Sequence, residues 1–226
     1  MVTVLVLGTL DTKGLEYEYL CERLRSNGVD PLVVDVGVLG EPLLTADVSR
    51  EEVARAAGAE LASLASRMDR GEAVSAMARG AAAVVGKLAE AGRIRGAIAL
   101  GGTGGTAIAS RAFRVLPLGV PKVIVSTAAS GNTQMYVGET DLVLMPSVAD
   151  IAGINRLSAR IIANAAAVLA GMVLASPLEF NASKWVVGAS NVRCDDAVCD
   201  GSTSAAGSAW LRSSRLPYDR DRRAHA

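Results

Sequence analysis

The feature that most constrains the fold is a regular alternation of short apolar runs with helical segments. Apolar runs rich in Val, Ile and Leu lie at residues 2–7, 31–36, 96–100, 122–125 and 141–145. Helical patterns occupy 15–26, 73–91, 106–115 and 148–174, and Ser49 with Glu52 forms a capping box that opens another helix. Strands that are apolar throughout are typical of parallel sheets covered on both faces. The sequence therefore predicts an α/β fold, a doubly wound, Rossmann-like, mostly parallel sheet with helices on both faces.

Charge and cysteine content narrow the class of protein. The 23 Lys and Arg residues equal the 23 Asp and Glu residues, so nothing indicates a nucleic-acid partner. Three cysteines are too few for a disulfide framework, and the start lacks a signal-peptide pattern, so we expect a cytoplasmic protein. No charge-free run reaches the roughly 18 apolar residues of a membrane span, and no membrane partner is expected. The most apolar stretch, 161–175, is interpreted as a buried helix.

A glycine- and threonine-rich segment follows the apolar run at 96–100 and leads into a helix. Glycines let backbone N–H groups approach an anion, and the N-terminus of a helix attracts negative charge. The segment lacks the lysine of a Walker A loop and the spacing of a dinucleotide loop. The segment therefore predicts a phosphate-binding loop that is neither a Walker A loop nor a dinucleotide-binding loop. A plain tight turn is the alternative. The residues of the segment are Gly101, Gly102, Thr103, Gly104, Gly105 and Thr106.

Two more polar loops follow apolar runs and would meet this segment at one edge of a parallel sheet. After 2–7, Lys13 is suited to neutralise phosphate and Asp11 to hold Mg²⁺ or a ribose hydroxyl, although Asp11 or Thr12 could simply cap a helix. After 122–125, the loop is rich in hydroxyl donors, with a solvated loop as the alternative. Asp35, at the end of the second run, has the place of a ribose-binding acid. The nucleotide-contacting candidates of the two loops are Thr9, Asp11, Thr12, Lys13, Ser126, Thr127, Ser130 and Gly131.

Several segments together resemble the Tm-1-like ATP-binding family. The resemblance depends on Gly8-Thr-Leu-Asp-Thr-Lys-Gly14, Met77-Ala-Arg-Gly80, the segment 101–106, Leu116-Pro-Leu-Gly-Val-Pro-Lys122, Val125-Ser-Thr-Ala-Ala-Ser-Gly131 and Ser147-Val-Ala-Asp-Ile-Ala-Gly-Ile-Asn155. It extends almost without gaps to about residue 190. The resemblance implies a Rossmann-like nucleotide-binding domain over 1–180, ATP as cofactor with Mg²⁺, a homodimer, and a second α/β domain. It implies no established reaction.

The chain departs from this family after Ser190. Residues 181–190 look like the start of the second domain, whose next residues in the family are Met-Phe-Gly-Val-Thr-Thr-Pro-Cys-Val. This chain instead reads Asn191-Val-Arg-Cys-Asp-Asp-Ala-Val-Cys-Asp200. A one-base shift of the reading frame permits the family motif in order, and the same shift permits a second glycine loop over Trp210–His225. We infer that 191–226 is a frameshifted, disordered tail on a truncated two-domain protein.

The coding DNA around Ser190 tests the frameshift. We expect its shifted frame to encode the family motif and, further on, the second glycine loop. A shifted frame that encodes neither would overturn the inference.

Three functions remain open from the sequence. The first is a nucleotide-binding module without turnover. The second is an ATP-dependent transferase or ligase that acts in a cleft between two domains. The third is an α/β domain that binds another phosphorylated metabolite. Because the only histidine is His225, no Ser–His or Cys–His pair is available in the α/β region, which excludes triad hydrolases.

Overall fold

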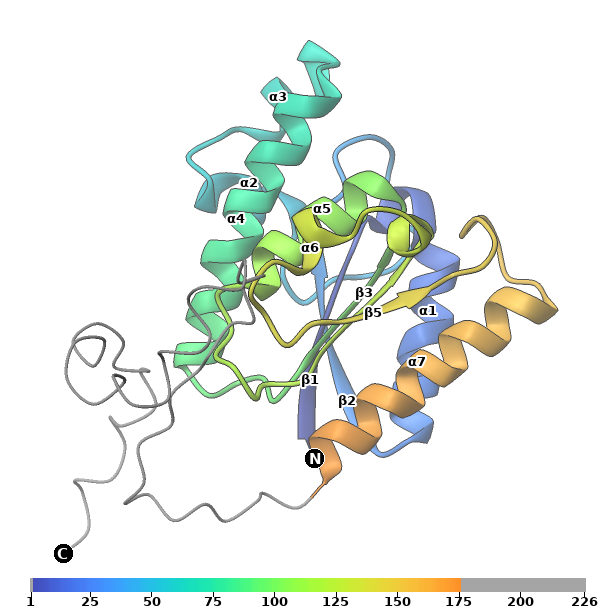
Figure 1. Ribbon diagram of the computed structural model, residues 1–226. Coiled ribbons are helices and arrows are strands. Elements are labelled where there is room, and N and C mark those ends of the chain that lie inside the picture. Colours follow the sequence, from blue (N-terminus) through green and yellow to red (C-terminus); the bar gives the residue numbers. More distant parts are fainter. Residues whose placement is uncertain (1, 176–226) are drawn as a thin grey trace, which may run out of the picture. The chain divides into compact units, whose positions relative to one another are not determined.

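A computed structural model of the chain describes residues 2–175, which form a five-stranded parallel sheet. The sheet order is β2-β1-β3-β4-β5 (Figure 1). The strands are β1 (Val2–Gly8), β2 (Val29–Asp35), β3 (Ala97–Gly101), β4 (Lys122–Ser126) and β5 (Val143–Pro146). The predicted second-domain start at 181–190 and the predicted frameshifted tail at 191–226 lie outside the described residues.

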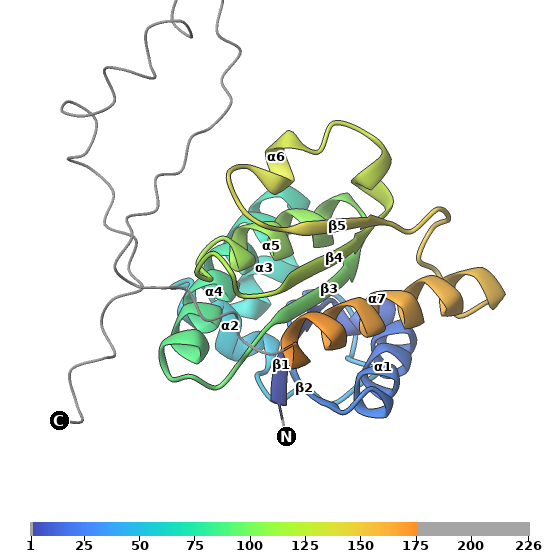
Figure 2. The same ribbon diagram turned by 60° about the horizontal axis from the view of Figure 1, so that its bottom comes forward.

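Helices cover both faces of the sheet, which confirms the predicted α/β class. One face carries α1 (Leu10–Ser26) and α7 (Arg156–Leu174), and the other carries α2 (Arg50–Ala56), α4 (Arg70–Glu90) and α5 (Thr103–Phe113) (Figure 2). The remaining short elements are α3 (Leu61–Arg67), the 3-10 helix η1 (Thr127–Ser130) and α6 (Gln134–Val137). The chain turns back at the pair β1/β3, where the strand order reverses.

The alternation of side chains along β1 divides the core into two apolar clusters. Leu5 and Leu7 pack in the cluster on the α4–α5 face, and Val4 and Val6 pack in the cluster on the α1–α7 face. All four side chains are buried. Both faces of the sheet are therefore closed to water, and ligands can reach it only at its ends.

Most predicted elements are confirmed, although four helices begin elsewhere than predicted, among them α1 at Leu10 instead of 15 and α4 at Arg70 instead of 73. The capping box of Ser49 and Glu52 opens α2 as expected. Helix α5 begins at Thr103, three residues before the predicted start, so four of the six residues of the glycine-rich segment are helical. The helical pattern at 148–174, which includes the predicted buried helix at 161–175, forms a helix only from Arg156.

Helix α7 also differs from the prediction because it buries one face only. Ile162, Ala166 and Leu169 pack in the core, whereas Val168 and Met172 are exposed. Within residues 2–175, α7 is the one helix long and apolar enough to cross a membrane, and a third of its most apolar window is buried. Its amphipathic burial is that of a helix that covers a sheet.

Two of the segments that support the family resemblance maintain the fold. In the segment 77–80, Gly80 lets α4 approach α2, because a Cβ at this position would lie 1.9 Å from the carbonyl oxygen of Val53. In the segment 116–122, Lys122 is fully buried at the start of β4. Its Nζ donates to the carbonyls of Pro117 (2.9 Å) and Val120 (2.8 Å) and to the carboxylate of Asp141 (2.5 Å).

A buried tyrosine links β1 to β3 near the end where the two strands diverge. The Tyr17 hydroxyl accepts from the N–H of Leu100 at 2.8 Å and lies 2.8 Å from the carbonyl of Leu7 and 2.6 Å from that of Leu100. Burial raises the pKa of this phenol well above its usual value, so it stays a proton donor. Gly8 makes room for the ring, since a Cβ there would lie 1.9 Å from its Cζ atom.

We expect Tyr17→Phe to lower the free energy of unfolding by about 1–3 kcal/mol, because the buried N–H of Leu100 would lose its partner. Urea unfolding of the variant measures the change. Tyr19→Phe, on the same helix, is the control and should change stability by less than about 0.5 kcal/mol. Equal losses in the two variants would contradict the role given to the Tyr17 hydroxyl.

The Lys122–Asp141 pair should make stability depend on pH. Burial opposes ionisation of Asp141, but hydrogen bonds from Lys122 and Gly119 outweigh it and hold the pKa of the carboxyl below its ordinary value. A depressed folded-state pKa contributes stability that is complete above the unfolded-state pKa of about 4 and is lost as pH falls through the folded-state value.

Asp141→Asn should therefore destabilise the protein at pH 7 and flatten the loss of stability below about pH 4. Urea unfolding of wild type and variant between pH 2.5 and 7 compares the two profiles. Asp30→Asn, an exposed aspartate, is the control. A profile of Asp141→Asn parallel to that of wild type would contradict the prediction.

Candidate functional site

The candidate site lies at the carboxyl end of the sheet, over the diverging strands β1 and β3. In doubly wound sheets, ligands bind in the crevice outside the strand ends where the strand order reverses. Here the order reverses between β1 and β3, and the loops at Thr9 and Gly102 begin on the two sides of that point. We call this place the switch crevice.

The first turn of α5 forms one wall of the switch crevice. Its N-cap is Gly102, and no side-chain hydrogen bond caps it. The first intrahelical bond runs from the N–H of Thr106 to the carbonyl of Gly102, at 2.9 Å. The first N–H groups of a helix have no partner within it, and they carry its partial positive charge. The glycines Gly102, Gly104 and Gly105 leave these groups accessible, which suits an anion.

An arginine that the sequence analysis missed lies beside this turn. A Cβ built at Gly104 would lie 3.6 Å from Nη2 of Arg70 and 3.5 Å from Val74, so the Arg70 guanidinium adjoins the start of α5. Arg70 is exposed and forms no ion pair within residues 2–175. Because only the packing of α4 against α5 brings it here, no pattern near residue 70 could have indicated it.

The loop after β4 lies against the glycine-rich segment. The hydroxyls of Thr106 and Ser126 are buried and hydrogen-bonded to each other at 2.6 Å, and Ser126 also accepts from the N–H of Ala128. These two predicted contact residues therefore form the floor below the site. Thr127 is half-buried, with its hydroxyl 3.6 Å from a Cβ built at Gly102. The predicted residues Ser130 and Gly131 are exposed at the far end of η1.

The loop after β1 brings the predicted residues Thr9, Thr12 and Lys13 to the same edge. The Thr12 hydroxyl donates to that of Thr9 at 2.9 Å. Lys13 has φ −134° and ψ 25°, which interrupts the start of α1, and its Nζ donates to the carbonyl of Ile151. Lys13 thus has a protein partner, although only one of its three N–H groups is used within the described chain.

Asp11, the predicted Mg²⁺ or ribose contact, anchors a neighbouring loop through one of its carboxylate oxygens. Its Oδ2 accepts from the N–H groups of Val38 (3.1 Å) and Leu39 (2.8 Å) and so anchors the loop after β2. Its Oδ1 is shielded from solvent and has no hydrogen-bond partner among the described residues. Within residues 2–175 no group of three or more His, Cys, Asp or Glu side chains could hold a metal ion.

The structure also assigns Asp35 a structural contact rather than the expected ribose site. Its Oδ1 accepts from the N–H groups of Leu10 (3.1 Å) and Gly37 (2.8 Å), and only 2% of the residue is exposed. Burial is the main cause that raises the pKa of this carboxyl, and the charge of Asp11 adds to it. Asp35 therefore ties the start of α1 to the end of β2.

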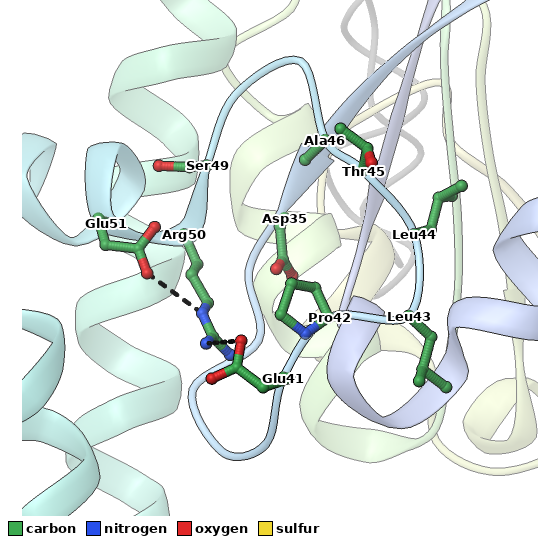
Figure 3. A pocket seen from close by; sticks show the side chains of 10 residues that line it. All are labelled: Asp35, Glu41, Pro42, Leu43, Leu44, Thr45, Ala46, Ser49, Arg50 and Glu51. Carbon is green, nitrogen blue, oxygen red and sulfur yellow. Dashed lines mark hydrogen bonds and ion pairs between the residues drawn. The ribbon is translucent and has the colours of Figure 1, made fainter.

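A cavity of about 390 Å³ lies next to Asp35, below the loop after β2 (Figure 3). The cation on its wall is Arg50, which pairs with Glu51 at 3.3 Å and Glu41 at 3.7 Å and also donates to the carbonyl of Gly40. Figure 3 shows Arg50 between these two glutamates. Since the charge of Arg50 is already balanced, this cavity does not offer an anion site, whereas Arg70 has no acidic partner among the described residues.

The segment from Ser147 to Asn155, which we call the strap, joins β5 to α7 and crosses to α1. Besides the Lys13–Ile151 contact, the N–H of Gly153 donates to Oε1 of Glu16 at 2.6 Å. Val148 has φ +64°, an uncommon value for a β-branched residue, and the N–H of Ala149 donates to the carbonyl of Ser147 across it at 2.7 Å. The sequence analysis missed Glu16, because nothing local distinguishes it from other helix glutamates.

Comparisons with known proteins agree with this architecture. Residues 2–177 match the model of the N-terminal domain of an uncharacterised protein family, UPF0261. A UPF0261 protein of Clostridium tetani is 46% identical over 186 residues, which cover 82% of this chain and 46% of that protein. A UPF0261 protein of Rhizobium meliloti is 42% identical over 188 residues, 83% of this chain and 46% of that protein.

A plant protein also matches. The ToMV resistance protein Tm-1(GCR237) of tomato (Solanum lycopersicum) is 39% identical over 186 residues, which cover 76% of this chain and 25% of that protein. The chain spans about half the length of the bacterial relatives it matches. The resemblance to the Tm-1-like family is confirmed: the chain belongs to the UPF0261 family, and its residues 2–177 match the family's N-terminal domain.

Proposed function

We propose that this domain binds a nucleotide, ATP, with the phosphate groups against the first turn of α5. The observation that carries the proposal is an unbalanced positive charge at the switch crevice. The uncapped N-terminus of α5 and the unpaired guanidinium of Arg70 adjoin each other, and no carboxylate within residues 2–175 pairs with Arg70. Two positive groups at one place favour an anion.

The polar groups around the crevice suit the rest of a phosphate chain. The hydroxyls of Thr9 and Thr12 flank it at the end of β1, and Thr127 lies beside Gly102 at the end of β4. The nucleoside part of the ligand comes from the family resemblance, which implies ATP. Mg²⁺ would be held by phosphate oxygens and water, because Oδ2 of Asp11 is held by the N–H groups of Val38 and Leu39 and its Oδ1 is shielded from solvent.

The described residues supply binding groups more readily than catalytic ones. The acids Asp11, Asp35 and Glu16 all accept backbone N–H bonds and so hold neighbouring loops, and Asp35 and Glu16 are almost fully buried. The proposal is therefore a nucleotide-binding module, and turnover by a longer protein is a separate question.

We expect isothermal titration calorimetry of the full chain to detect ATP binding and Arg70→Gln to weaken it about tenfold, the effect of one charge-assisted hydrogen bond. Adenosine, which lacks phosphate, should bind wild type and variant equally. The control is Arg79→Gln, because Arg79 is exposed on the same helix but donates to Ser75.

The outcomes separate the candidate functions. If ATP does not bind but a sugar phosphate does, the ligand is another phosphorylated metabolite and the ATP proposal is wrong. If ATP binds equally well to wild type and Arg70→Gln, its phosphates do not lie at α5.

A further inference from the structure

The strap is held to α1 by two contacts of unequal character. Glu16 is almost fully buried, and its carboxylate accepts the N–H of Gly153 at 2.6 Å. Ile151, two residues before Gly153 in the strap, is buried in the core cluster of α1 and α7. The Glu16 contact is therefore a charge-assisted bond within the protein interior, where water does not compete with it.

The second contact, from Lys13, pairs a full charge with a neutral group. Its Nζ donates to the carbonyl of Ile151, and within residues 2–175 it forms no ion pair. Lys13 is only partly buried and follows Thr9 and Thr12 at the edge of the switch crevice. A hydrogen bond between two charged groups is stronger than one to a neutral carbonyl, so a phosphate in reach would compete successfully for this ammonium.

The strap has a local feature that favours a second conformation. Val148 lies in the left-handed region at φ +64°, its side chain is 78% exposed, and packing does not explain its backbone conformation. A β-branched residue at positive φ costs free energy, which is recovered if the backbone moves to a negative φ. The strained residue, Val148, and the residue that Lys13 contacts, Ile151, are three residues apart in the nine-residue strap.

We propose that Lys13 is a positioning residue that switches between the strap and a bound phosphate. Without ligand, it fastens Ile151. When the phosphate chain occupies the switch crevice, the ammonium moves to the phosphate oxygens. The strap then remains attached to α1 through the Glu16 hydrogen bond and the buried Ile151 side chain, and its backbone turns about Val148. The inference rests on the proposed function, because it needs a phosphate at this crevice. The two contacts of Lys13 are thermodynamically linked. The Lys13–Ile151 contact weakens the affinity for phosphate by the same factor by which bound phosphate weakens the Lys13–Ile151 contact.

Hydrogen–deuterium exchange of peptides that cover residues 147–155 tests the switch in the full chain. ATP or pyrophosphate should raise exchange in wild type about fivefold, roughly the effect of one lost hydrogen bond. Lys13→Met should show the raised exchange without ligand, no further rise with ATP, and weaker ATP binding. Lys87→Met, an exposed lysine on α4, is the control and should behave as wild type.

Glu16→Gln distinguishes the switch from a general loosening of the strap. It weakens the other contact and leaves Lys13 in place, so exchange should start higher and still rise with ATP. If calorimetry shows that ATP binds but the strap does not respond, the switch is wrong and the proposed function stands. If neither ATP nor pyrophosphate binds, the proposed function fails and the switch fails with it.

Discussion

The hydroxyl of Tyr17 is the interaction on which the geometry of the crevice depends. Two parallel strands normally keep their backbone hydrogen bonds to the end of the shorter strand. In contrast, β1 and β3 pair only where Leu5–Leu7 of β1 lie beside Ala97–Ala99 of β3. Beyond that point one phenol oxygen satisfies the N–H of Leu100 and contacts the carbonyls of Leu7 and Leu100. Two strands can therefore separate without leaving buried backbone groups unpaired, and the loops that follow them begin apart.

The segments that support the family resemblance divide into two groups by place. Gly80 and Lys122 serve helix packing and the start of β4. The other segments, at 8–14, 101–106, 125–131 and 147–155, all follow strands and meet at the carboxyl edge. The hydrogen bond from Lys13 to the carbonyl of Ile151 joins two of these segments directly. Of the six segments that support the resemblance, two thus serve the fold and four lie at the carboxyl edge of the sheet.

The sequence allowed the sheet, its strands and the glycine-rich wall to be predicted, because these depend on local patterns. Apolar runs mark buried strands, and glycine before a helix marks an accessible N-terminus. Contacts between distant elements could not be predicted in this way. Arg70 reaches Gly104 only through the packing of α4 on α5, and Asp35 and Asp11 turn to backbone N–H groups of neighbouring loops. The local sequence around an aspartate at a strand end does not distinguish an aspartate that faces a ligand from one that holds a neighbouring loop.

The buried Lys122 lies at the opposite end of β4 from the crevice, because the strand runs from Lys122 to Ser126. The Lys122–Asp141 network and the groups around the switch crevice thus occupy opposite ends of the sheet. Substitutions in the ligand-facing loops can accumulate without disturbing the Lys122–Asp141 network, and damage to that network can be offset without altering the loops. Such a separation makes a domain tolerant of evolutionary change in ligand preference, since binding and stability can drift independently.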